Sequence, residues 1–354
     1  MAKAGCREAA GRFVQQNQFR EQHHPGAFPR FRLISGLRTH RSRRIATKTG
    51  HDTELCFNDL RASFLGGQQY LDEGKTAHRR TFPISQSEIR NCSILSRVNL
   101  REAFDRHSTS YDARFSGVAI GERVRSEVWE LADAAFSAST HILDLGSGTG
   151  EDAIHFARKG LHVTAVDVSP GMMHRLKTKA DAAGLSAGIH CRISEMDRYR
   201  PCDFRFDGIL SNFGAINCVD DLTWLRDVAQ PGLKPGSRLV LTAMGSFYPL
   251  EFIVFLLKGQ PRLAFRRLRR PVDIAIDGVP VRVHYHSLKS IERMLGPAFH
   301  LESVRGLRSL LPAPGWEHIE ARVRWLAPID RLVCRARPTA TFADHFVSVW
   351  QYRP

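Results

Sequence analysis

The chain has 354 residues and a net charge of +15 at pH 7, so it is longer than a typical single domain and strongly basic. Its most apolar run, Phe247 to Leu257, has 11 residues, whereas a membrane-spanning helix needs roughly 20. The seven cysteines are odd in number and contain no Cys-x-x-Cys pair. The sequence therefore indicates neither a disulfide framework nor a metal site, and favours a reducing, cytoplasmic location.

The basic charge is concentrated in an N-terminal extension, residues 1–97. Residues 1–50 contain 11 Lys and Arg against 2 Glu and show no sustained apolar period, so the extension is predicted to be mostly disordered. Three explanations stay open. The extension binds an anionic partner such as RNA, it is an organellar presequence, or it is a non-native start upstream of a working start near Val98, where a helix-like segment begins.

A glycine-rich turn follows an apolar predicted strand at residues 142–150, which read ILDLGSGTG. Gly146, Gly148 and Gly150 are each separated by one residue, and glycine lets bare backbone approach a ligand because it has no Cβ and tolerates positive φ. A second predicted strand, residues 162–167, ends at Asp167, whose carboxylate would lie beside the turn and could accept hydrogen bonds from a ribose diol. Together these features predict an adenosine ligand.

The residues after the glycines distinguish among adenosine ligands. The dinucleotide fingerprint needs a glycine where this chain has Glu151, which is followed by Asp152. Two carboxylates at that point would repel a pyrophosphate, but would not oppose a ligand that carries a sulfonium and an ammonium group. The turn therefore predicts a cationic adenosine cofactor and disfavours NAD.

An acid, one residue, Gly-x-Gly-x-Gly and an acid at the end of the next strand resemble the motif of the class I S-adenosylmethionine-dependent methyltransferases. The resemblance covers about residues 98–354 and is firmest over 142–244. It implies an α/β fold: a doubly wound, Rossmann-like, seven-stranded sheet with an antiparallel last strand, helices on both faces and an N-terminal helical cap. The other strands that match are residues 188–193, 206–211, 237–242, 299–306 and 346–351.

The resemblance also implies which residues hold the cofactor, S-adenosylmethionine. Glu195 and Met196 follow the third strand, where the family places an acid that binds the adenine amino group and a backbone N–H that binds the ring. The segment that begins at Ser211 and Asn212 borders the methionine moiety and the acceptor in these enzymes. The complete expected set is Asp144, Gly146, Ser147, Gly148, Gly150, Asp167, Val168, Glu195, Met196, Ser211 and Asn212.

An insertion at residues 246–290 separates the fifth strand from the last two and is long enough to form a lid. Its first part, 247–257, is strongly apolar, and its second, 258–270, carries six Lys and Arg and no acid. One interpretation is an amphipathic acceptor, such as a quinone, polyketide or lipid, with the same face able to contact an acidic membrane surface. The other is a buried lid helix followed by a solvated basic helix.

Methyl transfer requires alignment of the reacting atoms, and it requires a base only if the acceptor is protonated. The candidates are His284 and His286, which alternate on a strand-like stretch and so share one face, and Tyr111 in the helical cap. Each has a structural alternative, as a surface strand residue or a packing residue. O-, N- and C-methylation are not distinguished by the sequence.

The sequence thus predicts an enzyme that transfers a methyl group from S-adenosylmethionine to a small lipophilic acceptor. An RNA methyltransferase that uses the basic extension is one alternative, although the Asp-Pro-Pro-Tyr type of motif is replaced by Ser211-Asn212-Phe213-Gly214 and no RNA-binding module is recognised. A non-catalytic protein that only binds the adenosine cofactor is the other.

Overall fold

The computed structural model describes residues 99–117, 119–201, 205–269, 271–312 and 322–354. These residues belong to a compact unit that spans residues 84–354. The basic extension, residues 1–97, and the proposed start at Val98 lie outside the described residues.

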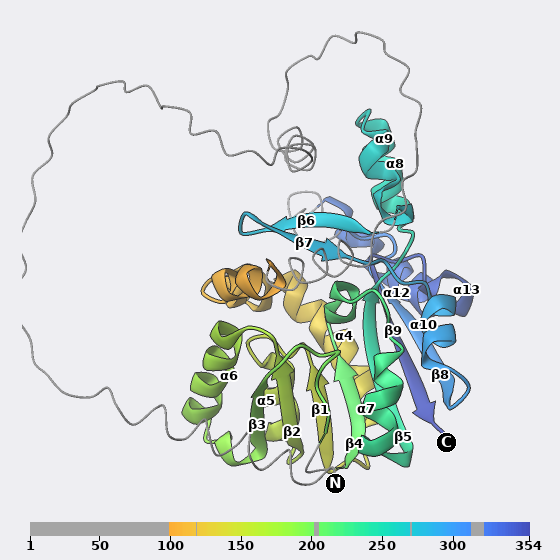
Figure 1. Cartoon of the computed structure of the whole chain (residues 1–354). Helices are drawn as coiled ribbons and strands as arrows, with labels where there is room; N and C mark the ends of the chain where they lie inside the picture. The colour runs from red at the N-terminus through yellow and green to blue at the C-terminus, as the bar shows by residue number, and fades with distance from the viewer. Residues whose placement is uncertain (1–98, 118, 202–204, 270, 313–321) are drawn as a thin grey trace, which may run out of the picture. The chain divides into compact units, whose positions relative to one another are not determined.

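A seven-stranded sheet with the order β3-β2-β1-β4-β5-β9-β8 forms the centre of this unit (Figure 1). The neighbours from β3 to β5 pair in parallel, whereas β9 lies antiparallel between β5 and β8. The doubly wound sheet with an antiparallel last strand is therefore confirmed. The strands are β1 (His141–Leu145), β2 (His162–Asp167), β3 (Ile189–Ile193), β4 (Phe206–Ser211), β5 (Leu233–Met244), β8 (Phe299–Leu307) and β9 (His345–Tyr352).

Helices cover both faces of the sheet because successive side chains of each strand point to opposite sides. In β1, Ile142 packs with α4, α5 and α6, whereas Leu143 and Leu145 pack with α7 and α10. Both layers are apolar clusters of buried side chains, as expected for a parallel sheet buried on its two faces. The helices are α4 (Ala119–Ala135), α5 (Glu151–Arg158), α6 (Pro170–Ala182), α7 (Trp224–Gly232), α10 (Leu288–Leu295), α12 (Ala327–Arg335) and α13 (Arg337–Ala340).

The insertion after β5 contains two helices and a β-hairpin: α8 (Pro249–Leu257), α9 (Pro261–Ala264), β6 (Val272–Ile276) and β7 (Val279–Val283). Asp277 and Gly278 form the turn with φ of 45° and 80°, the positive values that a tight two-residue hairpin needs. The strand-like stretch predicted to carry His284 and His286 is shorter in the structure, because β7 ends at Val283 before either histidine. Figure 1 shows the hairpin near the helical backbone of residues 99–107, with α8 and α9 projecting beyond it.

Helix α8, in the apolar first part of the insertion, was predicted in one of the two interpretations to be a buried lid helix. Glu251 is the one buried residue of α8, and its apolar side chains are partly or largely exposed. The interpretation of α8 as a buried helix is therefore wrong. Within the described residues, no helix is long and apolar enough to cross a membrane.

Candidate functional site

A cavity of about 540 Å³ lies at the carboxyl ends of the parallel strands. Gly146 follows β1, Val168 follows β2 and Asn212 follows β4, and all three line this cavity. Its opposite wall comes from residues 100–115 and from the β6–β7 hairpin. Open α/β sheets bind ligands at this edge, and the volume falls within the range of small-molecule sites.

The glycine turn approaches the cavity with bare backbone. Gly146, Gly148 and Gly150 have φ of 74°, 54° and 86°. Gly146 and Gly148 line the cavity, and a Cβ on Gly148 would meet no protein atom within 4 Å, so it would project into open space. Gly150 serves packing instead, because its Cβ would lie 2.0 Å from Cδ1 of Leu176 on α6.

Asp167 lies at the end of β2 and lines the cavity. Its Oδ2 accepts a hydrogen bond from the backbone N–H of Gly148 and its Oδ1 accepts one from Ser169, both at 2.9 Å. Burial raises the pKa of this carboxyl, although the two backbone donors oppose the shift. The carboxylate thus fixes the glycine turn, and its remaining lone pairs are available to a ligand.

Asp144 is buried at the end of β1, and neither of its carboxylate oxygens has a hydrogen-bond partner among the described residues. Burial, together with the charges of Asp152 and Asp167, raises its pKa well above the usual value. Nearby, Arg125 forms a buried ion pair with Asp152 at 3.0 Å, and Asn212 donates to the other oxygen of Asp152 at 3.0 Å. Since an unpartnered buried carboxylate is costly, the ionised form of Asp144 would need a cationic or hydrogen-bonding partner.

Of the other expected cofactor residues, Val168 and Met196 line the cavity. Glu195 does not appear in its lining; its carboxylate instead pairs with Arg198 at 2.8 Å. Ser211 is buried and donates to the carbonyl of Leu145 at 2.8 Å. Ser147 is buried too, with no hydrogen-bond partner for its hydroxyl among the described residues.

Residues 99–117 form the predicted cap over the glycine turn. Asp105 accepts hydrogen bonds from Ser169 and Gly171 at the start of α6, at 2.6 and 2.9 Å. Asp112 accepts from Thr149 of the turn at 2.6 Å and pairs with Lys179 at 3.0 Å. Cap, turn and α6 are therefore held together by two carboxylates.

Tyr111, a predicted catalytic residue, lies on this cap and lines the cavity. Burial raises the pKa of its hydroxyl to about 12. At neutral pH the phenol is therefore protonated and suited to donating a hydrogen bond rather than to accepting a proton.

The hairpin and the cap meet at Asp277, at the tip of the β6–β7 turn. Its carboxylate contacts Nδ1 of His107 at 2.8 Å and Nη1 of Arg114 at 2.7 Å. All three residues line the cavity. These contacts to His107 and then Arg114 lower the pKa of Asp277. Asp277, His107 and Arg114, here called the latch, thus close one side of the cavity.

His284 and His286 lie elsewhere. They border a separate cavity of about 210 Å³ beside α10 and are absent from the lining of the larger one. Nδ1 of His284 pairs with Asp220 at 3.0 Å, and Nε2 of His286 contacts the carbonyl of Val219 at 3.0 Å. The two histidines do border a common cavity, but the structure does not bring them to the glycine turn.

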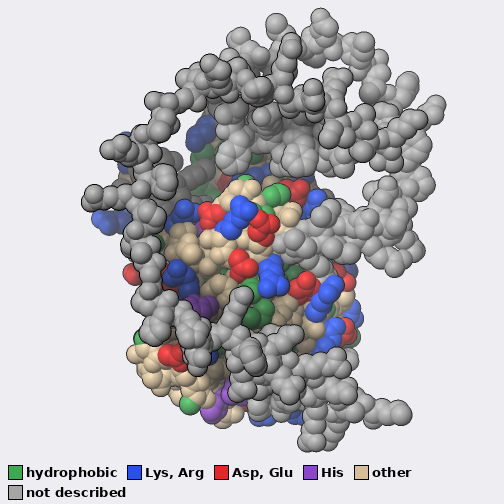
Figure 2. All heavy atoms as spheres, turned by 60° about the vertical axis from the view of Figure 1, so that its left-hand side comes forward, with side chains coloured by type: hydrophobic (Ala, Val, Ile, Leu, Met, Phe, Trp, Pro, Cys, Tyr) green, Lys and Arg blue, Asp and Glu red, His purple; other side chains and the backbone are tan. Residues whose placement is uncertain are grey.

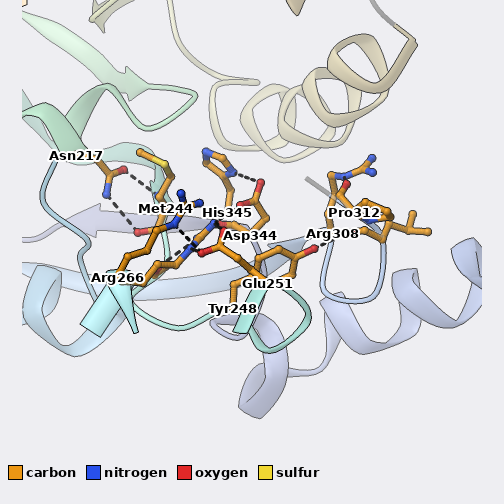
Figure 3. Close-up of polar contacts among 12 residues, drawn as sticks. Asn217, Met244, Tyr248, Glu251, Arg266, Arg308, Pro312, Asp344 and His345 are labelled. Carbon is orange, nitrogen blue, oxygen red and sulfur yellow. Dashed lines mark hydrogen bonds and ion pairs between the residues drawn. The ribbon is translucent and has the colours of Figure 1, made fainter. Parts of the chain in front are cut away.

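His345, which the sequence did not single out, lines the larger cavity, as His107 does. It begins β9 opposite Met244, the last residue of β5. Its Nδ1 contacts Oδ2 of the buried Asp344 at 3.0 Å (Figure 3). Burial would raise the pKa of Asp344, but His345 and Arg267 outweigh it and hold the pKa well below its usual range. An ionised carboxylate therefore orients the imidazole.

Known proteins resemble this chain in sequence. A family model described as a methyltransferase domain matches residues 142–236. The demethylmenaquinone methyltransferase of Tropheryma whipplei (strain Twist) is 30% identical over 175 residues, which cover 47% of this chain and 69% of that protein. The chain belongs to the class I S-adenosylmethionine-dependent methyltransferases. The predictions of this family and of its cofactor are confirmed.

Two other relatives in this methyltransferase family match a smaller part of their own length. The demethylmenaquinone methyltransferase of Clavibacter sepedonicus is 29% identical over 141 residues, 39% of this chain and 55% of that protein. The ubiquinone/menaquinone biosynthesis C-methyltransferase of Geotalea daltonii is 26% identical over 159 residues, 44% of this chain and 66% of that protein. The chain therefore spans about half to two thirds of these two relatives.

The cradle, the part of the cavity lined by Gly146, Gly148 and Asp167, fits the methyltransferase cofactor in two respects. Asp144 does not line the cavity, but its buried carboxylate, unpartnered among the described residues, suits a nearby positive charge. The open space beside Gly148 leaves room for a ligand against bare backbone, next to the carboxylate of Asp167.

Proposed function

We propose that this methyltransferase transfers a methyl group from S-adenosylmethionine to a small lipophilic acceptor. The observation that carries the proposal is the composition of the 540 Å³ cavity. Gly148 and Asp167 line it where the parallel strands end, and Ile274, Ala275 and Ile276 of the hairpin line its opposite wall. A polar cradle that continues into an apolar chamber suits a charged cofactor beside an apolar acceptor.

Within the cradle, we propose that Asp167 accepts hydrogen bonds from the ribose hydroxyls. Asp144 and the neighbouring Asp152 would supply negative charge toward the ammonium group, and Met196 would border the adenine. Asn212 would border the methionine moiety from its position between Asp152 and the cavity. Glu195 would reach the adenine only by leaving its pair with Arg198.

A hydroquinone is the acceptor class that we propose. The relatives from T. whipplei and C. sepedonicus carry the name demethylmenaquinone methyltransferase, and a fused aromatic ring suits the apolar chamber. The carbons of a quinone are electron-poor, whereas those of the corresponding hydroquinone become nucleophilic when a phenolic proton is removed. C-methylation of such a ring therefore benefits from a base near the acceptor.

We propose His345 as that base, in place of His284 or His286. Its Nδ1–H donates to ionised Asp344, so Nε2 is the nitrogen left to accept a proton. Among the described residues Nε2 forms no hydrogen bond, and the ring borders the chamber. Asp344 is a positioning residue, since it fixes the tautomer and stabilises the imidazolium without contacting the acceptor.

The proposed reaction balances as follows. The bound cofactor supplies a methyl group on sulfonium sulfur, which keeps the electron pair of the broken carbon–sulfur bond as a thioether. His345 removes the phenolic O–H proton, and the ring carbon forms the new carbon–carbon bond. The ring C–H proton is then lost as aromaticity returns and the oxygen is reprotonated, so the net change releases one proton.

The RNA alternative is less well supported. On the part of the face in Figure 2 that grey atoms do not cover, basic and acidic side chains are interspersed rather than gathered in one basic patch. A chain that bound RNA through residues 1–50 would show affinity that falls steeply with salt. A non-catalytic cofactor-binding protein would bind S-adenosylmethionine and transfer nothing.

The cytoplasm is the compartment that we propose. Cys191, Cys218 and Cys334, the cysteines in the described part of the chain, are all free thiols. Unpaired cysteines are typical of a reducing compartment.

Calorimetry and a methyl-transfer assay test the proposal in sequence. We expect the full chain to bind S-adenosylmethionine and S-adenosylhomocysteine but not NAD, and the Asp167→Ala variant to lose about tenfold or more in affinity because charge-assisted hydrogen bonds are lost. Asp227→Ala, an exposed carboxylate on α7, is the matched control.

Transfer of a radiolabelled methyl group to a prenylated 1,4-naphthoquinone is then measured with and without dithionite. Labelling of the ring only after reduction supports a hydroquinone acceptor. Cofactor binding without transfer to the reduced compound would refute that acceptor class, and labelling of RNA in its place would favour the alternative.

A further inference from the structure

The end of the helical pair α8–α9 exposes an unusual amount of apolar side chain. Every residue from 256 to 263 is exposed. Leu257 is 83% exposed, Leu268 54% and Ile253 52%, and Leu256, Leu263 and Phe265 are each more than 40% exposed. These six side chains, here called the apolar tip, come from two helices and the turn that follows them, so they form a group rather than scattered exposures.

Positive charge surrounds the apolar tip without any acid. From Phe252 to Val272 the sequence contains six Lys and Arg and no Asp or Glu. Lys258, Arg262 and Arg269 are exposed among the apolar side chains. Exposed leucines mixed with cations are the composition of segments that enter the interface of an anionic lipid bilayer.

The tip is held rigidly by the other two described arginines, which turn inward. Arg266 contacts both oxygens of Glu251 at 2.9 and 2.7 Å, and Arg267 contacts the same carboxylate at 3.1 and 2.9 Å. Arg267 also pairs with Asp344 at 2.6 Å, and these residues lie together in Figure 3. Burial would raise the pKa of Glu251, but Arg267 and Arg266 lower it. The base of the projecting segment is thus fixed by buried ion pairs.

The projection of the tip agrees with a surface role. Figure 1 shows α8 and α9 extending away from the sheet beyond the β6–β7 hairpin. The same insertion supplies Ile274 and Ile276 to the wall of the acceptor chamber. A surface that the tip entered would therefore lie next to the segment that encloses the acceptor.

We propose that the apolar tip inserts into the interface of an anionic lipid bilayer, where its leucines and Phe265 leave water and its cations face lipid phosphates. The inference rests on the proposed function in one respect, because a membrane is the reservoir from which a lipophilic acceptor would be drawn. The binding itself requires neither cofactor nor acceptor.

Vesicle flotation of the full chain tests this directly. We expect binding to vesicles of phosphatidylcholine and phosphatidylglycerol, with much weaker binding to phosphatidylcholine alone. The variant Leu257→Asp/Leu263→Asp should lose about tenfold or more in partitioning into the vesicles, since each substitution puts a charge where an apolar side chain would be buried in the bilayer interface. Lys258→Glu/Arg262→Glu should lose the preference for anionic lipid.

Leu332→Asp is the matched control, because Leu332 is 72% exposed on α12, outside the tip. The basic residues 1–50 are present in every variant, so any contribution from them cancels. Equal binding of the Leu257→Asp/Leu263→Asp variant and the control, or no binding by the unmodified chain, would overturn the proposal. A dimer that this double variant dissociates in sedimentation experiments without lipid would also overturn it, in favour of a contact between copies.

Cofactor titration of the same variants separates the two proposals. Unchanged affinity for S-adenosylmethionine with lost flotation supports the tip as a membrane-binding surface. Retained flotation in a chain that methylates no reduced naphthoquinone would leave the tip proposal standing while the acceptor class failed.

Discussion

Nδ1 of His345 lies 3.0 Å from Oδ2 of Asp344, and the other oxygen of this buried carboxylate lies 2.6 Å from Nη2 of Arg267. One carboxylate therefore connects His345, which lines the 540 Å³ cavity, with Arg267, which follows α9. Arg267 also contacts Glu251, so the chamber and the projecting helices share one network of buried charges (Figure 3).

Replacement of the proposed base should slow the chemical step and leave cofactor binding intact. For His345→Gln we expect kcat with a reduced naphthoquinone to fall by about 10²–10⁴-fold, the usual contribution of general base catalysis. Affinity for S-adenosylmethionine should stay within about twofold of that of the unmodified chain, because the imidazole is not proposed to contact the cofactor. Stopped-flow methyl transfer and calorimetry measure the two quantities.

The control is His300→Gln, an exposed histidine at the opposite end of the β8–β9 pairing. It should keep both the rate and the cofactor affinity. If His345→Gln lowered affinity for the cofactor but retained the rate of methyl transfer at saturating cofactor, His345 would be a structural residue and the proposed base would be wrong.

Substitution of Gly148 tests whether the cofactor lies against the glycine turn, because its effect on cofactor affinity can be measured apart from its effect on stability. An alanine there would carry positive φ, with its methyl group in the open space of the cavity. We expect Gly148→Ala to lose cofactor affinity by more than about tenfold, together with roughly 1–2 kcal/mol of stability from the left-handed backbone. Calorimetry and thermal unfolding measure the two effects separately.

Gly160→Ala is the matched control, since Gly160 has φ of 86°, also meets nothing within 4 Å and lies outside the cavity lining. It should show a similar loss of stability and unchanged affinity. Equal affinities for the two variants would mean that the ligand does not lie against Gly148.

Asp144→Asn should stabilise the unliganded chain and weaken cofactor binding. The pKa of Asp144 is raised by burial, so the carboxyl favours folding below the unfolded pKa of about 3.9, and this contribution is lost as pH rises through the higher folded value. The amide removes the cost of ionising a buried group, and we expect a midpoint about 2–4 °C higher, equivalent to ~1 kcal/mol. Affinity for S-adenosylmethionine should fall about tenfold.

Thermal unfolding with and without saturating cofactor at pH 7 measures both changes. A lower midpoint for the unliganded Asp144→Asn variant would show that the carboxylate has a stabilising partner within the protein. Unchanged affinity would remove Asp144 from the cofactor site.

The latch at Asp277 should weaken in acid. Its pKa is lowered by His107 and Arg114, so its contribution is present above the unfolded pKa of about 3.9 and is lost as pH falls through the lower folded value. Hydrogen exchange of residues 272–283, corrected for intrinsic rates, should therefore be slow from pH 7 to about 4 and accelerate below that range. Asp277→Asn should exchange faster throughout.

Asp273→Asn provides the comparison, because Asp273 pairs with Arg282 inside the same hairpin and does not reach the cap. It should leave the exchange of the hairpin tip near that of the unmodified chain. Equal acceleration in both variants would indicate general loosening of the hairpin, not release of the latch.

Much of the fold and the cradle could be predicted from the sequence, because those features are local. The strand 142–145, the alternating glycines and Asp167 lie within 26 residues, and strand period and glycine φ preferences act over a few residues. The antiparallel last strand followed from the family resemblance. Glu195 shows the limit of such transfer, since it stands where the family usually has Asp and its carboxylate pairs with Arg198 in this structure.

Which histidine lines the large cavity was decided by tertiary structure. His345 lies more than 190 residues from Gly148 along the chain, and it borders the same cavity because β9 inserts between β5 and β8. His284 and His286 had a suitable alternating pattern, but β7 ends before them and the chain leads both to another cavity. Local periodicity determines which face a side chain shares with its neighbours, whereas long-range pairing of strands determines what that face contacts.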